Sequence, residues 1–316
     1  MIFLSSLQNL ASLTILCVIG YVIAWKGWVS RETEMFIPKL ITVVAIPPFL
    51  MGNVAKYFQR GDLLQLLLSS TVPFFSIFVS FVLFLGLAWL LRVDKRHTRL
   101  FAVASSTSNV ILIGIPVSTA LFGQSAIPHV LLYFLGNSVF FWTIGNYCIA
   151  CEGANPSQRI TVKETLRRIF SPPLCGLLAG MIIVLFHIPL PSAIADTCQY
   201  LGHLATPLAM IYVGIVVKSM NWSKEHFNKD IVFALILRLI ACPLVMIAFF
   251  AFVPLPSLQK HVYIIMAGLP TMTNIALLSA YYRADKEFGS AFTTLSAIIA
   301  MFTIPVWMAL NAHFFH

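Results

Sequence analysis

Apolar runs of about 20 residues, separated by short polar connections, recur along the whole chain. A run of this length forms a helix that can cross a bilayer, because each residue adds about 1.5 Å. The pattern predicts ten transmembrane helices, at 7–25, 35–55, 63–91, 99–122, 127–150, 169–187, 194–217, 230–253, 260–281 and 288–311. We therefore expect an all-α polytopic membrane protein.

Short motifs of the first half return in the same order in the second half, at an offset of about 160 to 168 residues. The pairs are IPPFLM (46–51) with TPLAMI (206–211), GDLLQLLL (61–68) with KDIVFALI (229–236), and the polar run 105–109 with GLPTMTN (268–274). Each half holds five spans, an odd number, so the second half enters the membrane from the opposite side. We predict inverted repeats at 1–150 and 169–316, joined by a cytoplasmic linker at 151–168.

The polar runs in spans 4 and 9 interrupt helices close to the predicted midplane. Asn109 lies roughly 15 Å from the start of span 4, and residues 270–274 lie roughly 15 to 21 Å from the start of span 9. Lipid cannot satisfy the peptide groups of a broken helix, so such a break lies inside protein or lines a cavity. Helix N-termini that face a cavity attract an anion, whereas freed carbonyls suit a cation.

These interruptions supply the candidate substrate-binding residues. We expect the two asparagines to bond substrate oxygens, the prolines to keep the helices open, and the glycines to allow close approach of the backbone. The full set is Ser108, Asn109, Gly114, Pro116, Gly268, Pro270, Thr271, Thr273 and Asn274. For the asparagines the alternative is hydrogen bonding between helices, and for the prolines it is a simple kink.

Composition agrees with a membrane protein, since 59% of residues are hydrophobic and 10% are charged. The net charge of +9 reflects topology and not nucleic-acid binding, because 15 of the 20 Lys and Arg lie in or beside alternate connections, beginning with the first. The positive-inside rule places these connections in the cytoplasm and both termini outside. We expect lipids as partners and no nucleic acid.

Charged residues inside the spans are few. All eleven Asp and Glu lie in connections or at span ends, so the midplane lacks the carboxylate that commonly relays protons or sodium. Arg238 is the candidate for pairing with a substrate carboxylate, although snorkelling or holding the carbonyls of a broken helix is the favoured alternative. His203, which can titrate near neutral pH, is more simply a packing residue. The sequence predicts no cofactor or metal site and lacks common hydrolase and phosphate-binding motifs, which argues against an enzyme.

Two segments resemble the auxin efflux carrier family. SNVILIGIPVSTALFG (108–123) is similar to its fourth span, and AGLPTMTNIALLSAYYRADKEFGS (267–290) to its ninth, particularly in bacterial members. The resemblance implies ten helices in inverted repeats, helices 4 and 9 crossing at the prolines, and spans 1, 2, 6 and 7 forming a scaffold. The short central connection resembles that of bacterial malate or malonate permeases.

These observations favour a secondary transporter of small organic anions, working by alternating access in the cell membrane. The alternatives are a sodium-coupled anion symporter and a membrane receptor that binds without transport. Sodium or a proton stays open as the coupling ion, and a homodimer stays open as the assembly.

Overall fold

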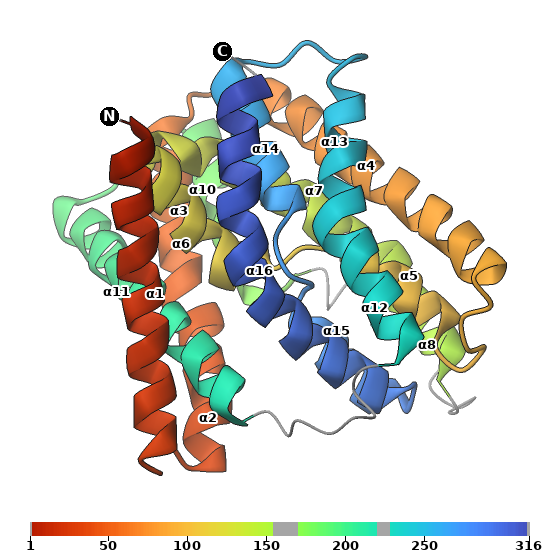
Figure 1. Cartoon of the computed structure of the whole chain (residues 1–316). Coiled ribbons are helices and arrows are strands. Elements are labelled where there is room, and N and C mark those ends of the chain that lie inside the picture. Colours follow the sequence, from red (N-terminus) through yellow and green to blue (C-terminus); the bar gives the residue numbers. More distant parts are fainter. Residues whose placement is uncertain (1, 154–169, 220–227, 315–316) are drawn as a thin grey trace. The chain divides into compact units, whose positions relative to one another are not determined.

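The computed structural model describes residues 2–153, 170–219 and 228–314, which form helices joined by short connections (Figure 1). Within these residues no strand is present beyond one isolated bridge, so the all-α prediction is confirmed for them. Most of the predicted linker, 151–168, lies outside the described residues.

The helices follow one another with few long gaps. In chain order they are α1 (Ile2–Trp25), α2 (Arg31–Lys39), η1 (Leu40–Ala45), α3 (Ile46–Tyr57), α4 (Asp62–Leu90), α5 (Thr98–Ser106), η2 (Val110–Gly114), α6 (Ile115–Phe122), η3 (Gln124–Ala126), α7 (Ile127–Phe140), η4 (Phe141–Gly145), α8 (Asn146–Glu152), α10 (Pro172–Leu185), α11 (Ser192–Ser219), α12 (Lys229–Ile236), η6 (Leu237–Ala241), α13 (Cys242–Phe249), α14 (Ser257–Ala267), α15 (Asn274–Tyr282) and α16 (Lys286–Phe314).

Several of these helices are suited to a membrane. In the described part of the chain, six stretches are long and apolar enough to cross one: Glu32–Tyr57, Leu67–Leu90, Gln124–Glu152, Ser192–Ser219, Lys229–Phe249 and Lys286–Asn311. Shorter apolar helices occupy Ala11–Trp25, Val110–Phe122 and Pro172–Leu185. A multi-pass membrane protein is therefore supported, while ten spans in two inverted repeats stay a prediction.

The helices form two compact units, and each unit draws on both halves of the sequence. Unit 1 comprises Met1–Ser70, Ile111–Leu135 and Phe170–Met220, and unit 2 comprises Thr71–Val110, Gly136–Ile169 and Asn221–His316. Spans 1, 2, 6 and 7 of the sequence prediction thus fall in unit 1, together with the second half of span 4 and the first parts of spans 3 and 5. The predicted repeats describe similarity along the sequence, so this spatial division does not test them.

In unit 1, α1 packs closely along α11 (Figure 1). Gly20 of α1 faces the carbonyl of Ile211, and Gly214 of α11 faces the carbonyl of Cys17. A Cβ atom at either glycine would overlap with the facing main chain. Small residues at such contacts allow two helix backbones to approach, which is the common means of helix association in membranes.

Replacing Gly20 or Gly214 by alanine is therefore expected to destabilise the protein. Overpacking against a backbone that cannot move aside costs about 1 to 3 kcal/mol. The midpoint of thermal unfolding in detergent should fall for each variant. Gly86→Ala is the matched control, because no atom lies within 4 Å of the position its Cβ would take. Equal midpoints for all three variants would contradict this account of the α1–α11 contact.

Three π-helical turns, η1, η2 and η6, each end directly before a helix with proline at its second position. These prolines are Pro47, Pro116 and Pro243. Proline cannot donate to the carbonyl four residues earlier, so the helix widens there instead of breaking. The carbonyl four residues before Pro243 is that of Leu239. It accepts a hydrogen bond from the indole N–H of Trp307 at 2.7 Å.

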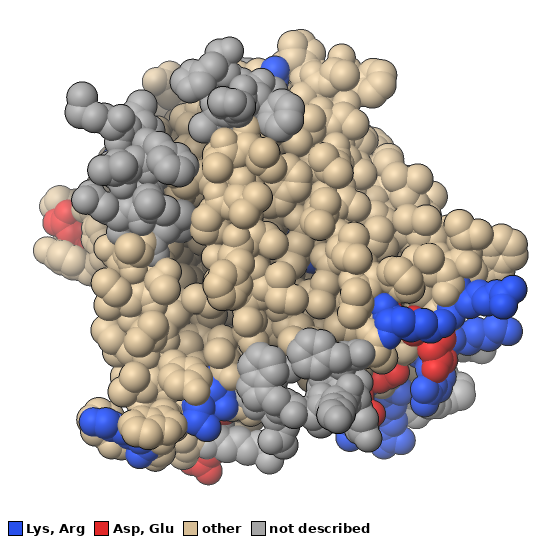
Figure 2. Space-filling model, in the orientation of Figure 1, with Lys and Arg blue, Asp and Glu red and all other residues tan. Residues whose placement is uncertain are grey.

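Charged side chains in unit 2 gather at one end, around the connections α4–α5 and α15–α16, and most of the visible face of its helices is uncharged (Figure 2). This distribution is typical of a membrane unit whose charged end lies in water.

Candidate functional site

Two broken helices meet inside unit 2. Residues 107–109 separate α5 from η2, and residues 268–273 separate α14 from α15. The two non-helical segments run antiparallel and form an isolated β-bridge between Ser108 and Thr271. Both breaks fall in the polar runs that the sequence singled out, and we refer to the place where the two segments pair as the crossing.

Hydrogen bonds replace those that the helices lose at the crossing. The main-chain N–H of Asn109 donates to the carbonyl of Pro270 at 2.9 Å. The N–H of Thr271 donates to Oγ of Ser296 at 3.2 Å, and the Thr271 hydroxyl donates to the carbonyl of Ala104 at 2.6 Å. The two segments of the crossing therefore bond each other and have defined partners in α5 and α16.

Asn137 of α7 completes the pairing of Ser108. Its Oδ1 accepts from the Ser108 N–H at 3.0 Å, and its Nδ2 donates to the Ser108 carbonyl at 3.1 Å. Both residues are fully buried. The side-chain amide of Asn137 thus forms the two hydrogen bonds that a paired β-strand would form with Ser108.

Asn137→Leu is expected to destabilise unit 2, because it removes two buried hydrogen bonds to the peptide groups of Ser108. The Ser108 carbonyl keeps the bond from the N–H of Val110 at 3.0 Å. A buried hydrogen bond contributes about 0.5 to 1.5 kcal/mol. The unfolding midpoint should fall clearly. Asn53→Leu is the matched control, since in the described part of the chain the Asn53 amide has one partner, the carbonyl of Phe49 in its own helix. A midpoint for Asn137→Leu no lower than that of the control would refute the proposed pairing.

Arg238 lies beside the crossing and is completely buried. Its Nε donates to the carbonyl of Leu269 at 2.8 Å, and Nη1 donates to the carbonyl of Ser105 at 3.3 Å. Its Nη2 donates to Oγ of Ser108 at 2.7 Å and also to the carbonyl of Ala267. The guanidinium therefore joins the ends of both broken helices.

No carboxylate is recorded as a partner of Arg238 among the described residues. A buried cation without a counter-ion is costly, and hydrogen bonds to carbonyl oxygens offset only part of that cost. The crossing therefore has a positive field, which favours a negatively charged ligand nearby.

Comparison with known proteins agrees with this architecture. The model of the membrane transport protein family matches residues 5–308. This chain belongs to that family. The match confirms the resemblance to auxin efflux carriers, and it makes the protein a membrane transporter and not an enzyme.

Three relatives are similar to this transporter over nearly their full lengths. An uncharacterized transporter of Methanothermobacter thermautotrophicus is 25% identical, covering 97% of this chain and 99% of its own. An uncharacterized transporter of Methanocaldococcus jannaschii is 22% identical over 94% and 96% of the two chains. A protein of Rhizobium meliloti, whose name proposes it as a malonate transporter, is 20% identical over 92% and 90%.

The transporter brings eight of the ten predicted site residues together in unit 2. They are Ser108, Asn109, Arg238, Gly268, Pro270, Thr271, Thr273 and Asn274. Among them, the amide of Asn109 donates to Oγ1 of Thr273 at 3.4 Å, a long hydrogen bond that a ligand oxygen could replace. The half-buried side chain of Asn274 has no hydrogen-bond partner among the described residues.

Gly114 and Pro116 belong to unit 1 instead. Pro116 is the second residue of α6 and lies seven residues after the break, so the expectation that helix 4 opens at this proline is wrong. Proline is well tolerated in the first turn of a helix, which explains its position. Pro116 and His203 both line a pocket of about 840 Å³ within unit 1, where the His203 side chain is exposed.

Several residues of the crossing were not singled out from the sequence. Asn137 and Ser296 were detectable only as polar residues inside apolar spans, a weak signal because helix contacts often contain them. Ser105 was noted as part of a polar run, and its buried Oγ lacks a partner among the described residues. Such an unsatisfied hydroxyl is common where a ligand or water binds.

Proposed function

We propose that this transporter moves small organic anions, such as malonate or malate, across the cell membrane by alternating access, with the crossing in unit 2 as the substrate site. The single observation that carries the proposal is the buried Arg238, which lacks a carboxylate partner among the described residues and lies against Ser108, the neighbour of Asn109. Asn109, Thr273 and Asn274 would donate hydrogen bonds to substrate oxygens. The name of the Rhizobium meliloti relative supports the choice of a dicarboxylate.

The contacts of Arg238 favour an anion over a sodium ion at this crossing. Sodium would require oxygen ligands, and the C-terminal ends of broken helices commonly provide carbonyls for it. Here the carbonyls of Ser105, Ala267 and Leu269 accept hydrogen bonds from Arg238. The guanidinium thus occupies the place that a coordinated cation would take, and its charge would repel one.

The N-terminal end of α15 adds to this preference. Asn274 is the first residue of α15, which follows the break directly. A helix N-terminus carries a partial positive charge and presents peptide N–H groups, both of which stabilise a carboxylate. We further propose that the charge pattern of the connections places both chain termini outside the cell.

Uptake into proteoliposomes tests the proposal. Purified protein is reconstituted, and entry of radiolabelled malonate, malate and indole acetate is measured with a sodium, proton or voltage gradient imposed one at a time. We expect uptake of at least one anion above protein-free vesicles, with no requirement for sodium. Uptake of none of the three anions would refute the substrate class. A strict requirement for sodium would refute the assignment of Arg238 as the resident cation.

A further inference from the structure

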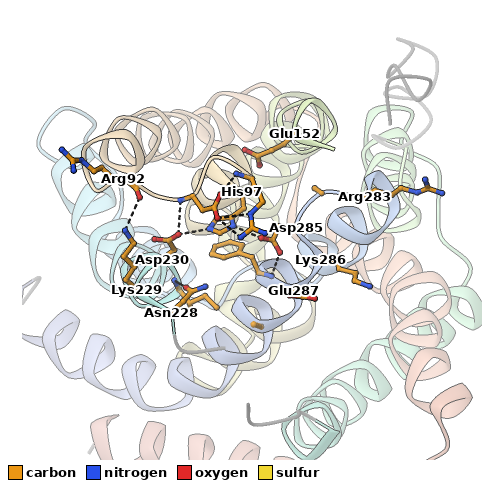
Figure 3. Close-up of a pocket in the computed structure, with 16 residues that line it drawn as sticks. Arg92, His97, Glu152, Asn228, Lys229, Asp230, Arg283, Asp285, Lys286 and Glu287 are labelled. Carbon is orange, nitrogen blue, oxygen red and sulfur yellow. Dashed lines mark hydrogen bonds and ion pairs between the residues drawn. The ribbon is translucent and has the colours of Figure 1, made fainter. Parts of the chain in front are cut away.

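A second cluster of charged side chains lies at the charged end of unit 2, around His97 (Figure 3). His97 immediately precedes α5 and is 3% exposed. Its Nδ1 lies 2.8 Å from Oδ2 of Asp285, and its Nε2 lies 3.0 Å from Oδ2 of Asp230. The ring of Phe288 stacks on the imidazole with a centroid distance of 4.4 Å. Both ring nitrogens therefore face carboxylates.

The geometry requires a dissociable proton. An ionised carboxylate can only accept a hydrogen bond, and a neutral imidazole can donate only one. Satisfying both contacts of His97 therefore needs either an imidazolium or a protonated Asp230 or Asp285. Oδ1 of Asp230 is also buried and has no hydrogen-bond partner among the described residues. Loss of the proton would leave two ionised carboxylates, the buried Asp230 and the partly exposed Asp285, beside a neutral ring.

Water and protons can reach this cluster through the pocket beside it, whose volume is about 1070 Å³. Charged groups face the pocket from every neighbouring element. The α4–α5 connection contributes Arg92, Asp94 and Arg96, and α8 contributes Glu152. Lys229 comes from α12, and Arg283, Lys286 and Glu287 come from the α15–α16 region.

The neighbouring carboxylates are held by contacts of their own. Hydrogen bonds from the Arg96 side chain and main chain lower the pKa of Asp94 to about 2, so Asp94 stays ionised near neutral pH. The two oxygens of Glu152 accept from the main-chain N–H groups of Arg99 and Leu100 at 2.6 and 2.7 Å. Glu287 is exposed to solvent. Among the charged groups that line this pocket, His97 and its two aspartates have the paired geometry that requires a dissociable proton.

The same three helices meet at His97 and at the crossing. His97 precedes α5, which carries Ser105 in its last turn, and Asp230 lies in the first turn of α12, which continues into Arg238. Asp285 caps α16 by accepting from the N–H of Phe288 at 2.9 Å, and α16 carries Ser296. Along each helix, eight to eleven residues, roughly 12 to 17 Å, separate the residue of the His97 cluster from the residue at the crossing.

We propose that His97, Asp230 and Asp285 form a proton-binding site that couples protonation at this end of unit 2 to anion binding at the crossing. This inference rests on the proposed function and names the proton as the second ligand of the same transporter. With the proton bound, His97 holds the ends of α5, α12 and α16 together. When it leaves, the two carboxylates repel each other, and the displacement of their helices reaches Arg238 and Ser296.

The test compares two replacements of His97 that differ in charge. Malonate affinity of the purified protein is measured between roughly pH 5.5 and 8.5, the range in which histidine usually titrates. The parent should show a change of about threefold or more with one inflection. His97→Lys, which stays positive, should keep the low-pH affinity throughout, and His97→Gln, which stays neutral, should keep the high-pH affinity. His261→Gln is the matched control, because His261 bonds Asn311 at 2.7 Å far along α16, and it should keep the inflection.

The outcomes separate this inference from the proposed function. If the parent binds malonate and His97→Gln retains the inflection, the proton site is refuted and the anion site stands. A uniform loss of affinity in both variants with the inflection preserved would show a structural role only, and would also refute it. If the parent binds no anion, the midpoint of thermal unfolding is measured as a function of pH, and this curve tests the proton site. Its inflection should vanish in both His97 variants and persist in His261→Gln, and any other pattern refutes the proton site.

Discussion

Arg238→Gln should abolish transport and strongly lower the unfolding midpoint. The guanidinium donates to three buried carbonyls and one hydroxyl from both broken helices, whereas glutamine offers a shorter side chain with two amide hydrogens. At least two of these acceptors would lose the hydrogen bond from residue 238, at about 1.5 to 3 kcal/mol each for a bond to a charged group. That loss is a large part of a typical stability of about 5 to 15 kcal/mol.

Arg238→Lys separates the two contributions of the side chain. Lysine keeps the positive charge but replaces the planar fork by a single ammonium with three donors. We expect an intermediate midpoint and weak residual transport. Lys95→Gln removes an exposed charge from the same unit and should leave the midpoint unchanged. A normal midpoint for Arg238→Gln would show that the network of hydrogen bonds does not hold the crossing together.

Asn109→Ala and Asn274→Ala should reduce transport by about 10- to 100-fold each, with little change in the unfolding midpoint. The value corresponds to the loss of one hydrogen bond to a charged group, about 1.5 to 3 kcal/mol. The fold should persist because the crossing uses the main chain of Asn109, which alanine retains. Initial uptake rates at equal protein content in proteoliposomes provide the measurement.

The aspartate variants at the same positions test the sign of the substrate's charge. Asn109→Asp and Asn274→Asp preserve the size of the side chain and add a negative charge, so an anion should be transported even less than by the alanine variants. Faster uptake by an aspartate variant than by its alanine counterpart would indicate a cationic or neutral substrate. Unchanged uptake in both alanine variants would remove the asparagines from the site.

The breaks in helices 4 and 9 could be predicted because their signals are local. Polar residues before Asn109, and the sequence Gly-Leu-Pro at 268–270, disfavour a helix wherever they occur in an apolar segment. Pro116 was misleading because the effect of a proline depends on its position in the helix. A proline in the interior interrupts a helix, whereas a proline in the first turn is well tolerated. Its role depends on where the preceding break falls, which one residue does not reveal.

The partners of Arg238 and His97 could not be predicted because they depend on long-range contacts. For Arg238 the sequence left open a substrate carboxylate, snorkelling to the interface, or the carbonyls of a broken helix, and the side chain bonds those carbonyls. Asp230 and Asp285 were noted only as residues at span ends, more than 130 positions from His97 along the chain. A single sequence contains no information on such pairs beyond their chemical types.

The main-chain contacts of Arg238 also bear on what a comparison of many relatives would reveal. Three of its acceptors are peptide carbonyls, so the side chains at 105, 267 and 269 can change during evolution without removing a hydrogen bond. Side-chain acceptors come from the hydroxyl of Ser108 and from Sγ of Cys242, which lies 3.6 Å from Nη1. Co-varying substitutions would therefore connect position 238 with positions 108 and 242 and would miss the carbonyl contacts, although these hold the two broken helices together.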